Sequence, residues 1–245
     1  MNTEIAAARL GGLLRAWCFG SACALCGTLL TDIGEYTIGL CGDCQKQFDL
    51  DFAAEPRCPR CGRPLISEQG LCMACRQQDV PPYDIALDLY PYRGVHAQLL
   101  EAYKFQKNRA AGRFLAQKLL QSAEYLASLG FHFDVWVPVP PRPGKLKEKG
   151  WDQLATLSSF LRGHKRISMP VQSCLKRLPS LTQKKLHRIE REENLKGKFL
   201  CIRKVPKRVL LFDDVMTTGA TLRSCSQALR SGGAEFIGAV ALFYD

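Results

Sequence analysis

Eight of the twelve cysteines in this 245-residue sequence form four pairs with the same spacing, Cys-x-x-Cys. Such a turn places two thiolates on one side of a tight knuckle, and two knuckles supply the four sulfur ligands of a tetrahedral Zn²⁺. Disulfides would require an oxidising compartment, and no secretion signal is evident; a redox Cys-x-x-Cys normally occurs once. The sequence therefore predicts two zinc sites, with these ligands: Cys23, Cys26, Cys41, Cys44, Cys58, Cys61, Cys72 and Cys75.

Four thiolates fill the coordination shell of Zn²⁺, so both sites are expected to be structural rather than catalytic. Pairing in chain order is the expected arrangement, and an interleaved one, in which Cys23 and Cys26 share a metal with Cys58 and Cys61, stays open. The segment has few large apolar residues, so metal must take the place of a core. The other four cysteines are expected to be ordinary buried residues: Cys18, Cys174, Cys201 and Cys225.

A second chemical signal follows the apolar run at residues 209–212. Two acids, Asp213 and Asp214, leave this expected strand, and a small, hydroxyl-rich loop then enters an expected helix: Thr217, Thr218, Gly219, Ala220 and Thr221. The N–H groups and hydroxyls of such a loop, with the helix dipole, can bind a phosphate. The carboxylates repel phosphate, so they must face sugar hydroxyls or a divalent cation. A plain Asp-capped turn needs neither the second acid nor the threonines.

An α/β sheet is expected to position this loop, because strand and helix patterns alternate after Pro81 and Pro82. The expected strands cover residues 85–89, 133–139, 209–212 and 237–243, and the expected helices cover residues 95–107, 110–128, 152–161 and 221–230. Residues 3–18 have the apolar spacing of an amphipathic docking helix. We therefore expect three parts: an N-terminal helix within 1–20, a double zinc ribbon at 21–80 and an α/β domain at 83–245.

The positive charge of the chain is concentrated in one block. The formal net charge is +11, and residues 142–208 carry 19 basic and 5 acidic side chains. This block suits a pyrophosphate or a nucleic-acid backbone, although a solvated surface would also have this composition. No segment reaches the ~18 consecutive apolar residues of a membrane-spanning helix, and no histidine stands out as a general base. We expect a cytoplasmic protein without a membrane span.

The loop at residues 209–221 resembles the phosphoribosyl pyrophosphate fingerprint of type I phosphoribosyltransferases. Other motifs narrow the resemblance to the ComF/GntX family over roughly residues 20–245: the paired zinc knuckles, Tyr103-Lys104-Phe105, Val137-Pro138-Val139-Pro140, Gly150-Trp151-Asp152-Gln153, Thr182-Gln183, Arg191 and Asn194. The resemblance implies a type I phosphoribosyltransferase fold, with a central, mainly parallel sheet flanked by helices, after an N-terminal double zinc ribbon.

The resemblance also implies a set of ligand contacts. Asp213 and Asp214 would meet the ribose hydroxyls, residues 217–221 would bind the 5-phosphate, and the turn with Pro141 and Arg142 would bind pyrophosphate. Mg²⁺ would bridge ligand oxygens with few direct protein ligands. Lys149, which replaces the usual arginine and cannot form its bidentate fork, would complete a catalytic set with the two acids. A hood at residues 176–198 and the acceptor site would use Gln153, Gln183, Arg188 and Arg191.

We therefore expect a ComF-type, phosphoribosyltransferase-like protein that binds phosphoribosyl pyrophosphate with Mg²⁺. The resemblance associates it with natural transformation, single-stranded DNA and partners from the competence machinery. Two alternatives stay open: a true base-salvage phosphoribosyltransferase and a ligand sensor without turnover. An enzyme of this class would let an acceptor attack the anomeric carbon of ribose and would release pyrophosphate, with positive charge stabilising the leaving group.

Overall fold

The computed structural model describes residues 22–49, 56–66, 69–77, 79–164, 169–179 and 195–245. The chain divides into two compact units. The first contains Met1–Asp49 and Arg93–Gln117, and the second contains Leu50–Tyr92 and Lys118–Asp245. The two halves of the cysteine-rich region thus belong to different units. The expected helix at residues 3–18 lies outside the described residues.

Helices form the first unit: α2 (Ile33–Ile38), α3 (Gly42–Lys46), α5 (Gly94–Lys104) and the first part of α6 (Arg109–Ser128). Asp32 caps α2 by accepting a hydrogen bond from the Glu35 N–H at 3.0 Å, as N-cap carboxylates do. Gly39 ends α2 in the left-handed conformation, with φ of 84°. A Cβ atom there would lie 2.1 Å from Ala110 Cβ, so only glycine allows α2 and α6 to approach this closely.

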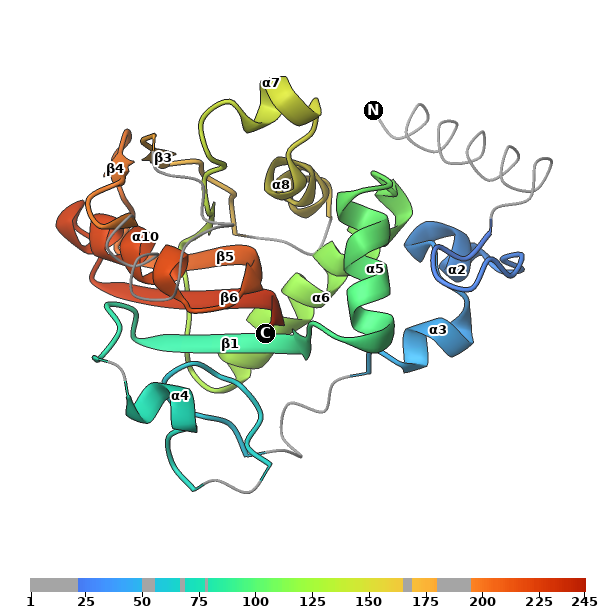
Figure 1. The fold of residues 1–245 in the computed structure, drawn as a ribbon, viewed down its shortest axis with the longest axis horizontal. Coiled ribbons are helices and arrows are strands. Elements are labelled where there is room, and N and C mark those ends of the chain that lie inside the picture. The colour runs from blue at the N-terminus through green and yellow to red at the C-terminus, as the bar shows by residue number, and fades with distance from the viewer. Residues whose placement is uncertain (1–21, 50–55, 67–68, 78, 165–168, 180–194) are drawn as a thin grey trace. The chain divides into compact units, whose positions relative to one another are not determined.

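A parallel sheet forms the centre of the second unit, with the strand order β1-β6-β5-β2. The strands are β1 (Ile85–Pro91), β2 (Val135–Pro138), β5 (Arg208–Met216) and β6 (Phe236–Tyr244), and Figure 1 shows β1, β6 and β5 side by side. The inner strands β5 and β6 are almost continuously apolar and buried, as strands covered on both faces are. Because all neighbouring pairs are parallel, the C-terminal ends of the strands meet at one edge.

Helices and a short hairpin complete the second unit. The helices are α4 (Met73–Arg76), α7 (Lys145–Lys149), α8 (Gln153–Gly163) and α10 (Ala220–Ser231), and the hairpin pairs β3 (Leu175–Arg177) with β4 (Phe199–Cys201). α10 contacts both β5 and the hairpin. The apolar residues Leu222, Cys225 and Leu229 lie on its buried face. α10 therefore links the sheet to the hairpin.

The expected class, a mainly parallel α/β sheet with helices, is confirmed. Most strand and helix bounds differ from the expected ones by a few residues. The main difference is β5, which continues through Val215 and Met216 because these residues still pair with Phe243 and Tyr244 of β6. Asp213 and Asp214 therefore lie inside the strand rather than beyond its end.

Candidate functional site

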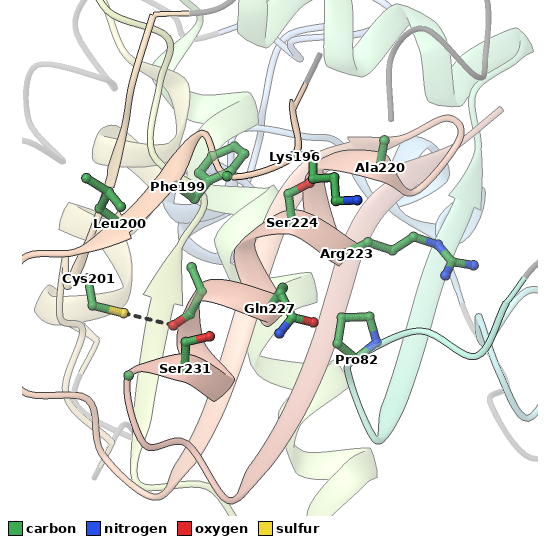
Figure 2. Close-up of a pocket in the computed structure, with 13 residues that line it drawn as sticks. Pro82, Lys196, Phe199, Leu200, Cys201, Ala220, Arg223, Ser224, Gln227 and Ser231 are labelled. Atoms are coloured by element: carbon green, nitrogen blue, oxygen red, sulfur yellow. Dashed lines mark hydrogen bonds between the residues drawn. The ribbon is translucent and has the colours of Figure 1, made fainter. Parts of the chain in front are cut away.

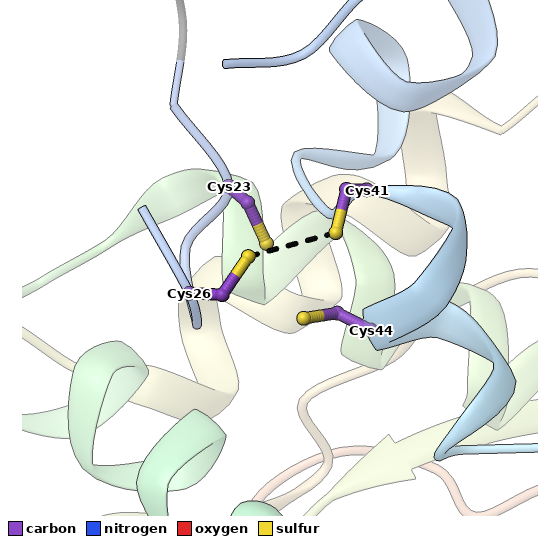
Figure 3. Close-up of side chains that lie close together, drawn as sticks. All are labelled: Cys23, Cys26, Cys41 and Cys44. Atoms are coloured by element: carbon purple, nitrogen blue, oxygen red, sulfur yellow. Dashed lines mark hydrogen bonds between the residues drawn. The ribbon is translucent and has the colours of Figure 1, made fainter. Parts of the chain in front are cut away.

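The first cysteine cluster lies in the first unit. The sulfur atoms of Cys23, Cys26, Cys41 and Cys44 all lie within 4.8 Å of one another, and Figure 3 shows the four side chains pointing toward one another. Cys26 Sγ and Cys41 Sγ are 3.6 Å apart. A tetrahedral Zn²⁺ with Zn–S bonds of ~2.3 Å places its ligands about 3.8 Å apart, so the cluster has the size of a zinc site.

The second cluster has the same composition and lies in the second unit. The sulfur atoms of Cys58, Cys61, Cys72 and Cys75 also lie within 4.8 Å of one another, and all four residues are buried. Cys61 Sγ and Cys72 Sγ are 3.7 Å apart. Each cluster combines two consecutive Cys-x-x-Cys pairs, so the expected pairing in chain order is confirmed and the interleaved arrangement is excluded.

The cysteines of each cluster differ in how readily they ionise. Hydrogen bonds to the Thr28 side chain and backbone lower the pKa of Cys26 to about 6. Burial opposes ionisation of Cys58, yet backbone hydrogen bonds, first from Cys72, lower its pKa to about 7. Burial raises the pKa of Cys44 and, in the second cluster, of Cys61. Four thiolates this close need a divalent cation to remain ionised together, and with no position left for water both zinc sites are structural.

The second candidate site is the loop between β5 and α10. Gly219 precedes α10 in the left-handed conformation, with φ of 77°, and the Ala220 N–H donates to Thr218 Oγ1 at 3.3 Å. Among the described residues, none accepts a hydrogen bond from the backbone N–H of Thr217, Thr218 or Gly219. A small hollow is lined by this loop, with Thr221 and the strand residue Asp213. The loop thus presents hydroxyls and donor groups around a concave surface.

The two acids have different surroundings. Asp213 is 8% exposed, and Arg177 and Cys225 lie close enough for its charge to act on their pKa values: burial lowers that of Arg177 and raises that of Cys225, and Asp213 adds an upward effect on both. Asp214 is only partly buried, and its N–H donates to Asp213 Oδ1 at 2.8 Å. Successive strand residues face opposite sides of the sheet. Asp214 is therefore the more accessible carboxylate.

The turn after β2 lies beside this loop in the sheet. Pro138 pairs with Phe212 of β5, and the Val139 N–H donates to Phe212 O at 3.0 Å. The exposed residues Pro141 and Arg142 follow directly. The Arg142 Nη1 donates to Glu148 Oε1 at 2.8 Å, with a second ion-pair contact through Nη2. The structure thus places the two expected anion-binding segments at the same edge of the sheet.

The remaining expected site residues lie on α7 and α8 or outside the described residues. Lys149 ends α7, and Gln153 is buried in the first turn of α8. Asp152 caps α8 by accepting a hydrogen bond from the Leu154 N–H at 3.0 Å. The hood residues Gln183, Arg188 and Arg191 lie outside the described residues. Of the expected buried cysteines, Cys174 and Cys225 are buried and Cys201 is partly exposed, whereas Cys18 lies outside the described residues.

Sequence reasoning missed a cavity of about 720 Å³ on the outer face of α10. Figure 2 shows Phe199, Leu200 and Cys201 of β4 on one side of it and Pro82 and Arg223 on the other. The Cys201 Sγ donates to the Ala228 carbonyl at 3.2 Å. Ala220, the first residue of α10, lines both this cavity and the small hollow at the loop between β5 and α10. No spacing in the sequence could reveal it, because three separate segments form its wall.

Sequence reasoning also missed a pair between the second ribbon and β1. The Arg63 Nε donates to Asp88 Oδ2 at 3.1 Å, and the Asp88 side chain is 1% exposed. Burial raises the pKa of Asp88, and the positive charge of Arg63 opposes this shift. The sequence did contain a signal for this pair. Asp88 is the single acid in the apolar run of residues 85–91, and a buried charge needs a partner.

Comparison with known proteins agrees with this arrangement. The family model described as "Double zinc ribbon domain" matches residues 14–76. "Competence protein F" of Haemophilus influenzae is 32% identical over 208 residues, which cover 81% of this chain and 87% of that protein. "DNA utilization protein YhgH" of Escherichia coli is 26% identical over 88% of this chain and 93% of that protein. "Competence protein ComFC" of Streptococcus pneumoniae is 22% identical over 87% and 95%.

Fold and site together define an α/β protein with two structural zinc sites in an N-terminal double zinc ribbon. Within that class, the chain belongs to the ComF/GntX family, the family of competence protein F. Among solved structures, hypoxanthine-guanine phosphoribosyltransferase of L. donovani overlaps 60% of this chain and 71% of that chain, at 16% identity and a TM-score of 0.33. An overlap this low assigns nothing, so the fold rests on its own strand order.

Proposed function

We propose that the chain binds phosphoribosyl pyrophosphate with Mg²⁺ at the loop between β5 and α10. The observation that carries the proposal is the group of three backbone N–H donors at Thr217, Thr218 and Gly219, for which no described residue is the acceptor. They stand at the start of a twelve-residue helix, where the helix dipole favours an anion. A 5-phosphate is the ligand group that matches these donors and the neighbouring hydroxyls.

The rest of the ligand would extend along the same edge of the sheet. Asp214 would accept hydrogen bonds from the ribose hydroxyls, while the buried Asp213 would help to hold the strand end. Pyrophosphate would lie at the turn with Pro141 and Arg142, where it would replace Glu148 as the partner of the guanidinium, and Lys149 would add charge. Mg²⁺ keeps much of its water and binds phosphate oxygens readily, so it would neutralise the ligand with few protein contacts.

The reaction class that suits such a site is transfer of the phosphoribosyl group to an acceptor, with release of pyrophosphate. The acceptor would lie near Gln153, under a hood that includes Gln183, Arg188 and Arg191. A sensor that binds the same ligand without turnover is the alternative. Incubation with the ligand, Mg²⁺ and a panel of purine and pyrimidine bases separates the two, since only the enzyme releases pyrophosphate.

Calorimetry tests the binding proposal itself. We expect the native chain to bind phosphoribosyl pyrophosphate in the presence of Mg²⁺, and Asp214→Asn to weaken binding more than Asp213→Asn, because Asp214 is the accessible acid. Asp43→Asn, which changes an exposed acid of the first unit, is the matched control and should bind as the native chain does. Absence of measurable heat from the native chain would refute the proposal.

A second proposal concerns single-stranded DNA and partners from the competence machinery in the cytoplasm. It is supported by the names of the relatives, which refer to competence and DNA utilization, and by the basic block at residues 142–208. Binding through phosphate contacts weakens steeply as salt rises. An affinity for single strands that does not change between low and moderate salt would remove this proposal.

A further inference from the structure

Arg63 joins the second ribbon to the loop between β5 and α10. Besides its bond to Asp88, its Nη2 donates to Thr217 O at 3.2 Å and to Met216 O at 3.4 Å. Its guanidinium carbon also lies 5.0 Å from the centre of the Tyr244 ring in β6. One side chain of the zinc ribbon thus contacts β1, β6 and the end of β5.

We infer that Arg63 is a positioning residue through which the second zinc ribbon aims the N–H groups of this loop at the bound phosphate. The part that concerns phosphate rests on the function proposed above. The part that concerns the loop rests on the contacts of Arg63 alone.

The planar peptide explains how contacts to carbonyls can aim N–H groups. Met216 O shares a peptide plane with the Thr217 N–H, and Thr217 O shares one with the Thr218 N–H. No cis peptide bond occurs among the described residues, and in a trans peptide the C=O and N–H point in opposite directions. By holding both carbonyls, Arg63 turns the Thr217 and Thr218 N–H groups away from itself. These are two of the three N–H groups without an acceptor.

The ribbon side of the contact is held by the zinc knuckle. The Gly62 N–H donates to Cys58 O at 2.8 Å, and the Cys58 N–H donates to Arg63 O at 2.9 Å. The backbone of Arg63 therefore belongs to the turn that presents Cys58 and Cys61. Arg63 cannot shift without distorting this turn.

The knuckle is in turn packed directly on β1. Gly62 has φ of 73°, and a Cβ atom there would lie 2.2 Å from the Ala86 carbonyl oxygen. The Arg57 Nη1 donates to Gly62 O at 2.8 Å and to Asp88 O at 3.0 Å. With the knuckle fixed on the sheet, the Arg63 guanidinium has a defined place beside the loop.

Hydrogen exchange of the zinc-loaded protein without ligand tests the loop contact. We expect Arg63→Ala to speed exchange in peptides that cover residues 214–222 and to leave peptides that cover residues 23–44 unchanged. Arg76→Ala is the matched control, because Arg76 lies in the same ribbon and its side-chain hydrogen bonds to described residues, Leu71 O and Gln69 O, stay within that ribbon. Loop exchange in Arg63→Ala that equals that of Arg76→Ala would overturn the inference.

Calorimetry with phosphoribosyl pyrophosphate and Mg²⁺ tests the phosphate part. We expect Arg63→Ala to weaken binding about tenfold, because a misdirected loop N–H would lose about the free energy of one hydrogen bond to a charged group. Arg76→Ala should leave the affinity unchanged. Arg63→Lys keeps a single donor nitrogen and the positive charge opposite Asp88, so it should restore part of the affinity. Native affinity in Arg63→Ala with two zinc ions bound would overturn this part.

One further variant keeps the outcomes distinct. Arg63→Ala removes the hydrogen-bond and ion-pair partner of the buried Asp88, which is destabilising. If this variant does not fold, the double variant Arg63→Ala with Asp88→Asn replaces it in both experiments. If the native chain itself does not bind the ligand, the proposed function fails. The exchange comparison still decides whether Arg63 holds the loop.

Discussion

Each zinc ribbon has four cysteine ligands in two Cys-x-x-Cys pairs, but the surroundings of the two ribbons differ. In the first, Cys26 is exposed and Cys41 is half-buried, whereas all four cysteines of the second are buried. The first ribbon packs on helices of its own unit, where Arg113 donates to Thr37 O at 2.8 Å. The second packs on a strand of the central sheet and reaches the loop between β5 and α10.

This difference shows that two zinc sites with the same type of ligand can have different structural roles in one chain. The first ribbon stabilises a helical unit. The second supplies Arg63 to the loop between β5 and α10, so its metal contributes to the shape of the candidate site. Four pairs of variants or measurements can break or sharpen this comparison.

Removal of one zinc ligand from each ribbon should give the largest effects. Cys61→Ser and Cys26→Ser should each lower zinc content from about two ions per chain to about one. A structural zinc contributes ~10–16 kcal/mol in isolated fingers, so both variants lose stability. Cys61→Ser should lose more, because its ribbon is packed into the sheet. Elemental analysis with thermal unfolding checks this, and equal losses of stability would contradict it.

The next largest loss of stability is expected from substitution of a glycine in the second ribbon. Gly62→Ala should lower the free energy of unfolding by about 3 kcal/mol, because left-handed strain adds to a clash with the β1 backbone. Gly70 has φ of 75° and nothing within 4 Å of an added Cβ atom, so Gly70→Ala should cost only about 1 kcal/mol. Denaturant unfolding of both variants measures the difference. Similar losses in the free energy of unfolding for the two variants would contradict a close contact between Gly62 and the β1 backbone.

One arginine in each unit provides a smaller contrast. Arg57→Ala removes two partly buried hydrogen bonds, one to Gly62 O within the second ribbon and one to Asp88 O that ties the ribbon to β1, and should cost about 2 kcal/mol. Arg113→Ala removes the exposed bond to the first ribbon, and should cost about 1 kcal/mol or less. The same unfolding measurement applies. A larger loss for Arg113→Ala would reverse the comparison.

Chelation compares the two ribbons by the rate at which each releases zinc, rather than by the free energy of unfolding. A chelator should take zinc from the first ribbon faster, because Cys26 is open to solvent and the second cluster is enclosed. Zinc release followed with a colorimetric dye should show two phases. The fast phase should disappear in Cys26→Ser and persist in Cys61→Ser; the reverse assignment would contradict the difference in burial.

Much of the fold could be predicted from the sequence, because its signals are local. The apolar runs that became β5 and β6 are continuous, and the helix after Gly219 follows a glycine that tolerates a positive φ. The zinc ligands were predicted from their spacing. Their pairing stayed open because four identical spacings can be combined in more than one way, and only the three-dimensional fold distinguishes the combinations.

The rest depends on contacts between residues far apart in the chain. The acid Asp88 lies within the apolar strand β1, and the sequence did not show that the second ribbon covers it or that Arg63 provides the opposite charge. The surroundings of Asp213, with Arg177 from the hairpin near it, were equally invisible. The hydroxyl-rich composition of the loop between β5 and α10 was visible in the sequence, whereas the contact of Arg63 with the carbonyls of this loop was not.

The position of β6 has a consequence for how the protein is made. β6 follows the other three strands of the sheet in the chain, yet it lies between β1 and β5. During synthesis β2 and β5 can pair early, whereas β1 has no neighbour in the sheet until Phe236–Tyr244 leaves the ribosome. Such pairing between distant segments is slow and leaves strand edges open to aggregation. A nascent chain paused before β6 is therefore the form most in need of a chaperone.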